Sequence, residues 1–290
     1  MSDEELRRLE REIAVAPHRL ELRRQQALLL LRHGREDEAL SALDLAWRLG
    51  ADELWDELQA RLAARRIDLG RFSLGWVPGG PFAMGSEELD ADTSPVHLVE
   101  LSGFWIADRP LPWGSVERWS GFPEWSRHRD WPGKEQWLQM SVSFTRDQAL
   151  DVLGYLEREL RPEGVAGRWA IPTEAQWERA LRACYLRPDG ACPYGALRSK
   201  HEMPEWTADR YHPDWYARSP RRDPTGPAAH DSHAQTFVVR GVPFLPDPEY
   251  ALYREAAKTD GSFDVGEPGG RTRWLQHEHG IALRPVFLPA

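Results

Sequence analysis

The fold of this chain is decided by the stretch Ile171-Pro172-Thr173-Glu174-Ala175-Gln176-Trp177-Glu178. Thr173 follows a proline, and its hydroxyl can accept a hydrogen bond from the first turn of a helix, as an N-cap residue does. Gln176 stands three residues later, at the position that completes a capping box. This pattern predicts a helix over residues 173–185.

Outward from this stretch, the chain divides into two parts whose composition changes near Gly70. Leu, Ala, Arg and Glu dominate residues 1–67, and these residue types are strong helix formers. Their apolar positions recur at helical spacing, which predicts four helices at about 3–14, 18–33, 36–48 and 52–65. Beyond the change, proline and glycine become frequent, and short runs typical of strands appear at 73–77, 97–101, 237–240 and 283–287.

These patterns predict an α+β protein in two parts. The first part is a small all-α segment over residues 1–67. The second is one irregular α+β domain over residues 72–290, in which the helix at 173–185 is preceded by another that begins near Thr145. The long, mostly loop-like region between 188 and 248 belongs to this domain, and loops of such length are usually functional or held by special packing.

One stretch of the helical segment resembles a tetratricopeptide repeat. It runs from Ala27 to Gly50, and the matching positions are Ala27, Leu30, Gly34, Ala39, Leu43 and Ala46. A single repeat cannot bury its apolar face unaided, so we expect it to pack on the neighbouring helices, on the second domain or on another protein. Two interpretations stay open, a helical cap and a surface that binds a partner.

The overall charge and composition exclude several classes of protein. The formal net charge is −9, and so acidic a protein is poorly suited to binding the phosphates of nucleic acid. No run of about 18 apolar residues occurs, so no membrane span is expected. The acidic N-terminus shows no signal-peptide pattern, and the two cysteines, Cys184 and Cys192, form no disulfide framework. We therefore expect a soluble cytoplasmic protein that binds neither nucleic acid nor membranes.

Several short pieces of the second domain follow a recognisable order. They lie at 77–85, 94–97, 104–106, 141–144, 171–178, 192–195, 205–209, 223–227, 239–241, 253–257 and 283–286. In this order the region from about Phe72 to Phe287 resembles the formylglycine-generating enzyme family, also called the sulfatase-modifying-factor family. The resemblance implies a C-type-lectin-like fold, an irregular α+β domain. It also implies that Trp105, Trp177 and Trp206, which stand in matching pieces, are buried.

The chemistry of that family depends on two cysteines that this chain lacks at the matching positions. Active members bind a copper ion through a Cys-x4-Cys pair near the C-terminus and oxidise a substrate cysteine, and soft thiolates suit Cu(I). Here the matching positions hold Tyr250 and Glu255, neither of which forms a thiolate. The resemblance therefore implies a catalytically inactive member, a pseudoenzyme that acts as an adaptor and binds another protein.

The resemblance also implies where such a partner binds. In active relatives the substrate lies in a cleft beside the two cysteines, so the expected binding residues are Tyr250, Tyr253, Glu255 and Trp274. Tyrosine and tryptophan are favoured at interfaces because they bury a large area and keep one polar tip. The alternative is that these residues only fill the space of the former active site. Two other functions stay open, a metal-dependent oxidoreductase with an altered site and the recognition of a small ligand or sugar.

A structural calcium ion is the metal that the resemblance implies. Members of the family hold Ca²⁺ near a segment that matches residues 201–206 here, where Glu202 and Glu205 supply the hard oxygen ligands that calcium prefers. The alternative for this segment is a loop braced by hydrogen bonds to Glu205.

The loss of both thiolates makes a prediction about chemistry. The purified protein, supplied with copper and oxygen, is expected to leave the cysteine of a sulfatase-type peptide unchanged, because Tyr250 and Glu255 cannot bind Cu(I) as thiolates do. Mass spectrometry of the peptide measures this, with an active member of the family as the positive control. Copper-dependent conversion of the thiol to an aldehyde would contradict the prediction.

Overall fold

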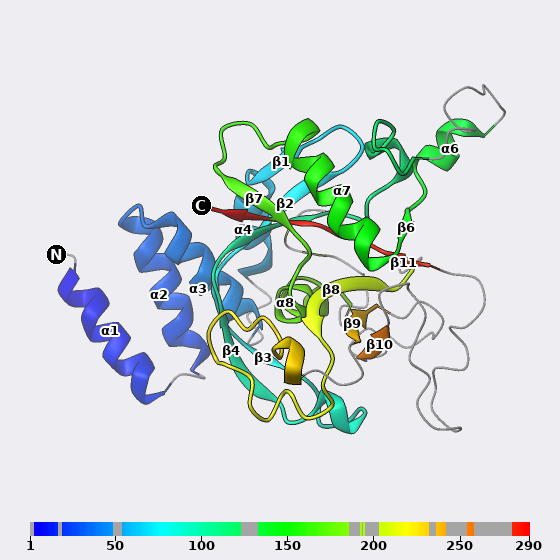
Figure 1. Cartoon of the computed structure of the whole chain (residues 1–290). Helices are drawn as coiled ribbons and strands as arrows, with labels where there is room; N and C mark the ends of the chain where they lie inside the picture. The colour runs from blue at the N-terminus through cyan, green and yellow to red at the C-terminus, as the bar shows by residue number, and fades with distance from the viewer. Residues whose placement is uncertain are drawn as a thin grey trace.

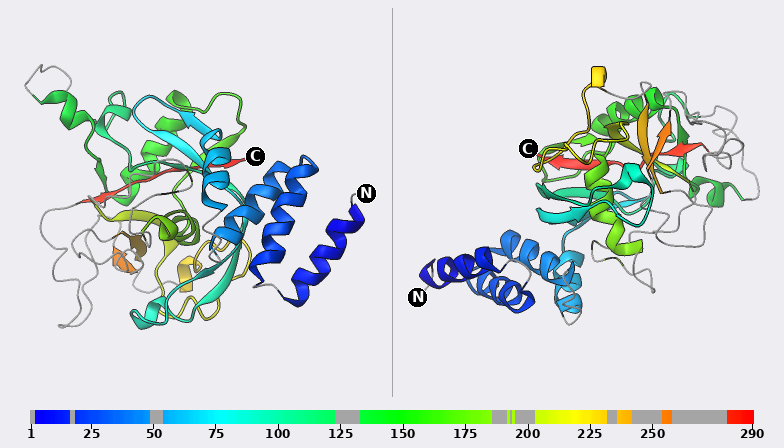
Figure 2. Two further views of the ribbon diagram at one scale, coloured as in Figure 1. Left: turned by 180° about the vertical axis from the view of Figure 1, so that it is seen from behind. Right: turned by 90° about the horizontal axis from the view of Figure 1, so that it is seen from below.

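The computed structural model describes residues 3–16, 19–48, 54–122, 133–185, 192, 194, 203–231, 236–241, 254–257 and 280–290. The expected helical segment is confirmed. Its helices are α1 (Asp3–Val15), α2 (Leu20–Arg32), α3 (Glu36–Arg48) and α4 (Trp55–Ala63). They lie together on one side of the molecule (Figures 1 and 2). Gly34 makes the turn between α2 and α3 with a φ of 68°, a conformation that costs glycine little.

The described residues of the second part form an α+β domain with one antiparallel sheet, one mixed sheet and one hairpin (Figure 1). The first sheet runs in the order β1 (Arg66–Asp68), β2 (Ser73–Val77), β5 (Phe104–Ala107), β12 (Val286–Pro289) and β7 (Gly167–Ala170). The second runs β10 (Glu255–Ala257), β9 (Phe237–Arg240), β8 (Glu205–Arg210), β11 (Ile281–Ala282) and β6 (Ser143–Phe144). The hairpin pairs β3 (Gly80–Met84) with β4 (His97–Leu101).

Among the described residues, these strands are accompanied by the helices α6 (Lys134–Leu138), α7 (Arg146–Glu159) and α8 (Glu174–Tyr185). The predicted capping box is present at α8, where the Thr173 N–H donates to Gln176 Oε1 at 2.9 Å and the Gln176 N–H donates to Thr173 Oγ1 at 3.2 Å. Thr145 caps α7 in the same way. Both helices therefore begin where the sequence predicts.

Strand β1 joins the helical segment to the domain. The sequence pattern placed residues 66 and 67 at the end of the helical part. In the structure β1 instead pairs with β2, with Ile67 opposite Leu74. Ile67 also packs against one of the two apolar cores. The last helix therefore ends at Ala63, and the chain enters the first sheet before residue 72.

The helical segment shares a core with the domain. Leu40 and Leu43 of α3 are fully buried in the same apolar cluster as Val77 and Phe82 of the domain. The sequence left three packing partners open for the repeat-like helices. The structure shows two of them, the neighbouring helices and the second domain. Because burial of apolar side chains drives folding, this shared cluster holds the two parts together.

A buried polar network lies at the same junction. Asp44 of α3 is fully buried and accepts hydrogen bonds from Arg179 of α8 at 2.9 Å, from Arg48 at 2.9 Å and from the Tyr194 hydroxyl. Burial opposes the ionisation of Asp44, but the two arginines outweigh it and lower its pKa below the ordinary value. Arg179 also donates to the carbonyl of Pro78 at 2.8 Å. One arginine thus ties α8, α3 and the loop before β3 together.

The three tryptophans of the matching pieces differ in their burial. Trp177 and Trp206 are fully buried, as expected. Trp105 is half-buried, which corrects the expectation for that residue. On β5 its side chain lies on the face opposite the buried Phe104 and Ile106, where it packs against its cross-strand partner Trp76 with ring centroids 5.1 Å apart.

Two further expectations concern the compartment. None of the described helices combines the length and the apolar character needed to cross a bilayer. Cys192 is disulfide-bonded, whereas the side chain of Cys184 lies outside the described residues. A disulfide is typical of oxidising compartments, so the cysteine content does not support the argument for a reducing one.

The burial of Trp177 generates a prediction about stability. Trp177→Ala is expected to lower the free energy of unfolding by about 3–5 kcal/mol, because it empties a large core site and removes the hydrogen bond from Nε1 to Glu205. Chemical denaturation measures the change. Trp105→Ala, at a half-buried position, is the matched control and is expected to cost less. A change below about 1 kcal/mol for Trp177→Ala would show that its ring contributes little to the core.

Candidate functional site

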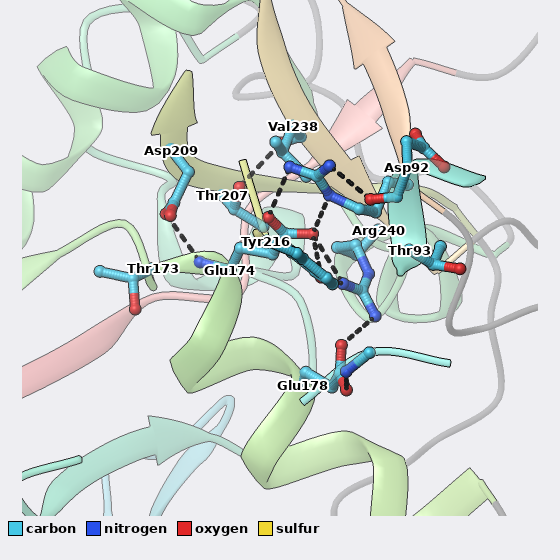
Figure 3. A network of polar contacts seen from close by, with 12 residues as sticks. Asp92, Thr93, Thr173, Glu174, Glu178, Thr207, Asp209, Tyr216, Val238 and Arg240 are labelled. Carbon is cyan, nitrogen blue, oxygen red and sulfur yellow. Dashed lines mark hydrogen bonds and ion pairs between the residues drawn. The ribbon is translucent and has the colours of Figure 1, made fainter. Parts of the chain in front are cut away.

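The candidate site is a cluster of buried charges between α8 and the second sheet (Figure 3). Helix α8 places Glu174 and Glu178 one turn apart on the same face, since residues four positions apart lie side by side on a helix. Both carboxylates are 1% exposed. A buried carboxylate is costly unless protein donors replace the water it has lost, so its partners decide what it can do.

Arginines at the end of β9 and directly before β10 supply those donors. Glu174 accepts from Arg240 at the end of β9 at 2.8 Å and from Nε of Arg254 at 2.7 Å. Glu178 accepts from Nη2 of Arg240 at 2.9 Å. The Tyr216 hydroxyl completes the shell of Glu174 at 2.9 Å. Two carboxylates thus face two buried guanidinium groups, and Glu178 also pairs with the partly exposed Arg182 at 2.8 Å.

This pairing keeps Glu174 ionised. Burial raises the pKa of Glu174, but the charges of Arg254 and Arg240 act more strongly in the other direction, so the pKa lies below its ordinary value. Burial and the negative charge of Glu174 raise the pKa of Tyr216 well above its ordinary value. At neutral pH Glu174 is therefore a carboxylate and Tyr216 a neutral phenol.

Asp209 on β8 is the titratable exception. Its Oδ2 accepts the backbone N–H of Glu174 at 2.7 Å, at the N-terminus of α8. Burial, and after it the negative charge of Glu174, raises the pKa of Asp209 to about 7. Asp209 thus changes its charge near neutral pH, at the N-terminus of α8 beside Glu174.

The charge cluster contacts the chain next to strand β10, which contains Glu255, one of the expected binding residues. Arg254 directly precedes Glu255, the first residue of β10, and pairs with Glu174 through two nitrogens. Strand β10 in turn pairs with β9, with Glu255 opposite Val239. The backbone at Glu255 is therefore fixed on one side by a sheet and next to it by a buried ion pair.

The other predicted binding residues fall outside this description. Tyr250, Tyr253 and Trp274 lie outside the described residues, and so does the side chain of Glu255. Glu202, one of the two expected calcium ligands, is outside them as well. The expected binding site consequently stays a prediction, apart from the position of the Glu255 backbone.

Glu205, the other expected calcium ligand, lies on β8 and is 1% exposed. Its Oε2 accepts from Trp177 Nε1 at 2.8 Å and from Arg284 Nε at 2.9 Å, and its Oε1 accepts from Arg284 Nη2 at 2.8 Å. Both oxygens thus already have protein donors, and a guanidinium balances the charge. In this arrangement Glu205 braces α8 against β8 and the segment after β11.

The paired arginines Arg240 and Arg254 were not predicted as site residues from the sequence. The available signal was their position, since both stand in the short pieces at 239–241 and 253–257 on which the expected resemblance rests. Composition cannot separate a buried, paired arginine from a solvated one. Only the meeting of β9, β10 and α8 shows that these charges belong together.

The comparisons with known proteins bear on the fold alone. No family model and no curated protein matches this chain. Among solved structures, the chain is similar to the Treponema denticola variable protein 1, at 14% sequence identity and a TM-score of 0.53. The match covers 77% of this chain and 98% of that one. The two proteins thus share an α+β fold over most of this chain, and the likeness assigns no activity.

The raised pKa of Asp209 generates a prediction about pH. In the unfolded chain an aspartate loses its proton near pH 3.8, whereas folded Asp209 keeps it to about pH 7. Its contribution to stability is therefore complete below pH 3.8 and is lost as the pH rises to 7. An asparagine at position 209 cannot titrate. Between pH 3.8 and pH 7 the free energy of unfolding of Asp209→Asn is therefore expected to fall less than that of the unmodified protein, by at least about 1 kcal/mol.

The measurement is the free energy of unfolding of both proteins at several pH values. Glu174 and Asp44, whose pKa values are lowered, act in the opposite direction but are present in both proteins. Asp214→Asn, at an exposed position, serves as the control that should follow the unmodified profile. Parallel profiles for Asp209→Asn and the unmodified protein would contradict the prediction.

Proposed function

We propose that this protein is a catalytically inactive member of the formylglycine-generating enzyme family that binds another protein. The observation that carries the proposal is the pair Tyr250 and Glu255, which stand where the family's two copper-binding cysteines would stand. Ten further pieces of the domain keep the family's order around this pair. The sequence thus retains the frame of the family and replaces the groups that perform its chemistry.

The charge cluster beneath β10 supports a role in binding. Each carboxylate of Glu174 and Glu178 is matched by arginine donors, so these groups are held as a framework. The backbone at Glu255 is thereby held in one position, and a preorganised surface binds more tightly because less freedom is lost on association.

The residues themselves indicate the chemistry of the partner. Tyrosine and tryptophan at 250, 253 and 274 supply aromatic area. A glutamate in place of a thiolate adds a group that accepts charge-assisted hydrogen bonds from Lys or Arg. The net charge of −9 also attracts basic proteins. We therefore propose a partner with a basic binding surface.

Two substitutions at the expected cleft test the proposal. Tyr250→Ala and Trp274→Ala, each in the full chain, are expected to weaken capture of the protein partner at least about tenfold, since aromatic anchors dominate interface energies. The readouts are the amount of partner retained from a lysate of the source cell and the melting temperature, which should hardly change.

Leu98→Ala is the matched control, because Leu98 on β4 is 48% exposed and belongs to the hairpin rather than to the cleft. It should retain the partner fully. If both cleft variants retain the partner as well as the control does, the proposed binding surface is wrong.

A further inference from the structure

A groove runs along α7 on elements other than β10. Its volume is about 610 Å³, a size that accommodates small ligands and short peptide segments. Helix α7 forms one wall with Arg146, Leu150 and Leu153, which follow each other at helical spacing. Arg168 on β7 and Leu288 on β12 contribute to the other side. We call this site the α7 groove.

Arg146 is held rigidly at the base of the α7 groove. It is 6% exposed, and its two terminal nitrogens donate to the backbone carbonyls of Thr207 and of Ala208. The guanidinium carbon lies 4.2 Å from the ring centroid of Phe237. These contacts fix the plane of the guanidinium, while its Nε has no hydrogen-bond partner among the described residues.

The charge of Arg146 sets it apart from the other buried arginines that the structure describes. Those others each form an ion pair with a buried carboxylate, namely Arg179, Arg240, Arg254 and Arg284. In the described part of the chain, Arg146 has no carboxylate within ion-pair distance. Burial lowers its pKa to about 10, with Asp209 nearby acting in the opposite direction. Arg146 therefore stays charged at neutral pH without a paired anion.

The remaining lining of the groove matches a carboxylate with apolar neighbours. Arg168 is a second cation, exposed on β7, and it forms no ion pair within the described residues. The Asp223 carboxylate also lines the groove, but its oxygens accept from the Ser102 N–H at 2.7 Å and from the Ser102 hydroxyl at 2.9 Å. Leu150 is 53% exposed, an apolar side chain that a ligand could cover.

The groove also receives the end of the described chain. Ala290 forms part of its rim, where the Ala290 N–H donates to the carbonyl of Ala166 at 3.0 Å. The Asp223 carboxylate forms no ion pair with Arg146 or Arg168 among the described contacts. The two cations of the groove are thus available to an external anion.

We propose that the α7 groove binds an extended peptide segment of a partner protein, with an acidic side chain on Arg146 and an adjacent aliphatic side chain on Leu150 and Leu153. Arginine is suited to this because its fork of donors matches the two oxygens of a carboxylate. A partly desolvated site strengthens the interaction, since charges attract each other more strongly away from water. The inference is independent of the cleft at Tyr250 and Glu255.

The test uses the full chain labelled with ¹⁵N and the peptide acetyl-Leu-Glu-Leu-amide as the probe. The Nε–H signal of Arg146 is expected to shift and saturate at peptide concentrations up to roughly 1 mM. The twin peptide with glutamine in place of glutamate is expected to bind about tenfold more weakly, because a hydrogen bond to a charged group is worth more than a neutral one. Binding of both peptides with equal affinity, or of neither, overturns the proposal.

Substitutions at exposed positions of the groove complete the test without disturbing the fold. Arg168→Gln and Leu150→Ser are each expected to weaken binding of the glutamate peptide several-fold, whereas Leu98→Ser, at a comparably exposed leucine outside the groove, should not. Unchanged binding by both groove variants overturns the proposal. Inorganic phosphate is the final arm, and the proposal is also overturned if phosphate displaces the peptide and binds equally well to the Leu150→Ser variant.

Discussion

Helix α8 carries buried charges at Glu174, Glu178 and Arg179, and each of them is neutralised by a group from another element. This constraint organises the protein. A charge removed from water is tolerated in a protein only when a partner and hydrogen bonds replace its hydration. The partners come from β9, from the residue before β10 and from α3, so one helix determines where three distant parts of the sequence lie.

The same rule explains the middle of α8. Trp177 stands between the charged positions and donates to Glu205, which is itself paired with Arg284. An indole and a guanidinium thus share one carboxylate at the junction of α8 and the second sheet. The strands of this domain are short, so each strand pair forms few backbone hydrogen bonds. Buried hydrogen bonds between side chains, such as these, then help to fix how the helix and the sheet are placed against each other.

Local features of this fold could be predicted from the sequence, and non-local ones could not. The capping box of α8 and the strands at 73–77, 97–101 and 237–240 depend on neighbouring residues, and the structure shows them at those positions. The run at 283–287 was wrong as one strand, because Ile281–Ala282 pairs in one sheet and Val286–Pro289 in the other. Likewise, no local pattern distinguishes buried Arg146 from a solvated arginine, because its burial depends on segments about 60 to 90 residues away.

The junction at Asp44 has a consequence for the modularity of the chain. The helices have the composition of a separable module, yet their removal would take away Asp44, the carboxylate that pairs with Arg179, and would uncover the apolar side chains of Val77 and Phe82 that share a cluster with α3. Both losses would lower the stability of the domain, which for an ordinary domain is only about 5–15 kcal/mol. The two parts therefore form one cooperative unit, and recombination that grafts this domain onto other N-terminal segments would have to supply a new carboxylate at the same place.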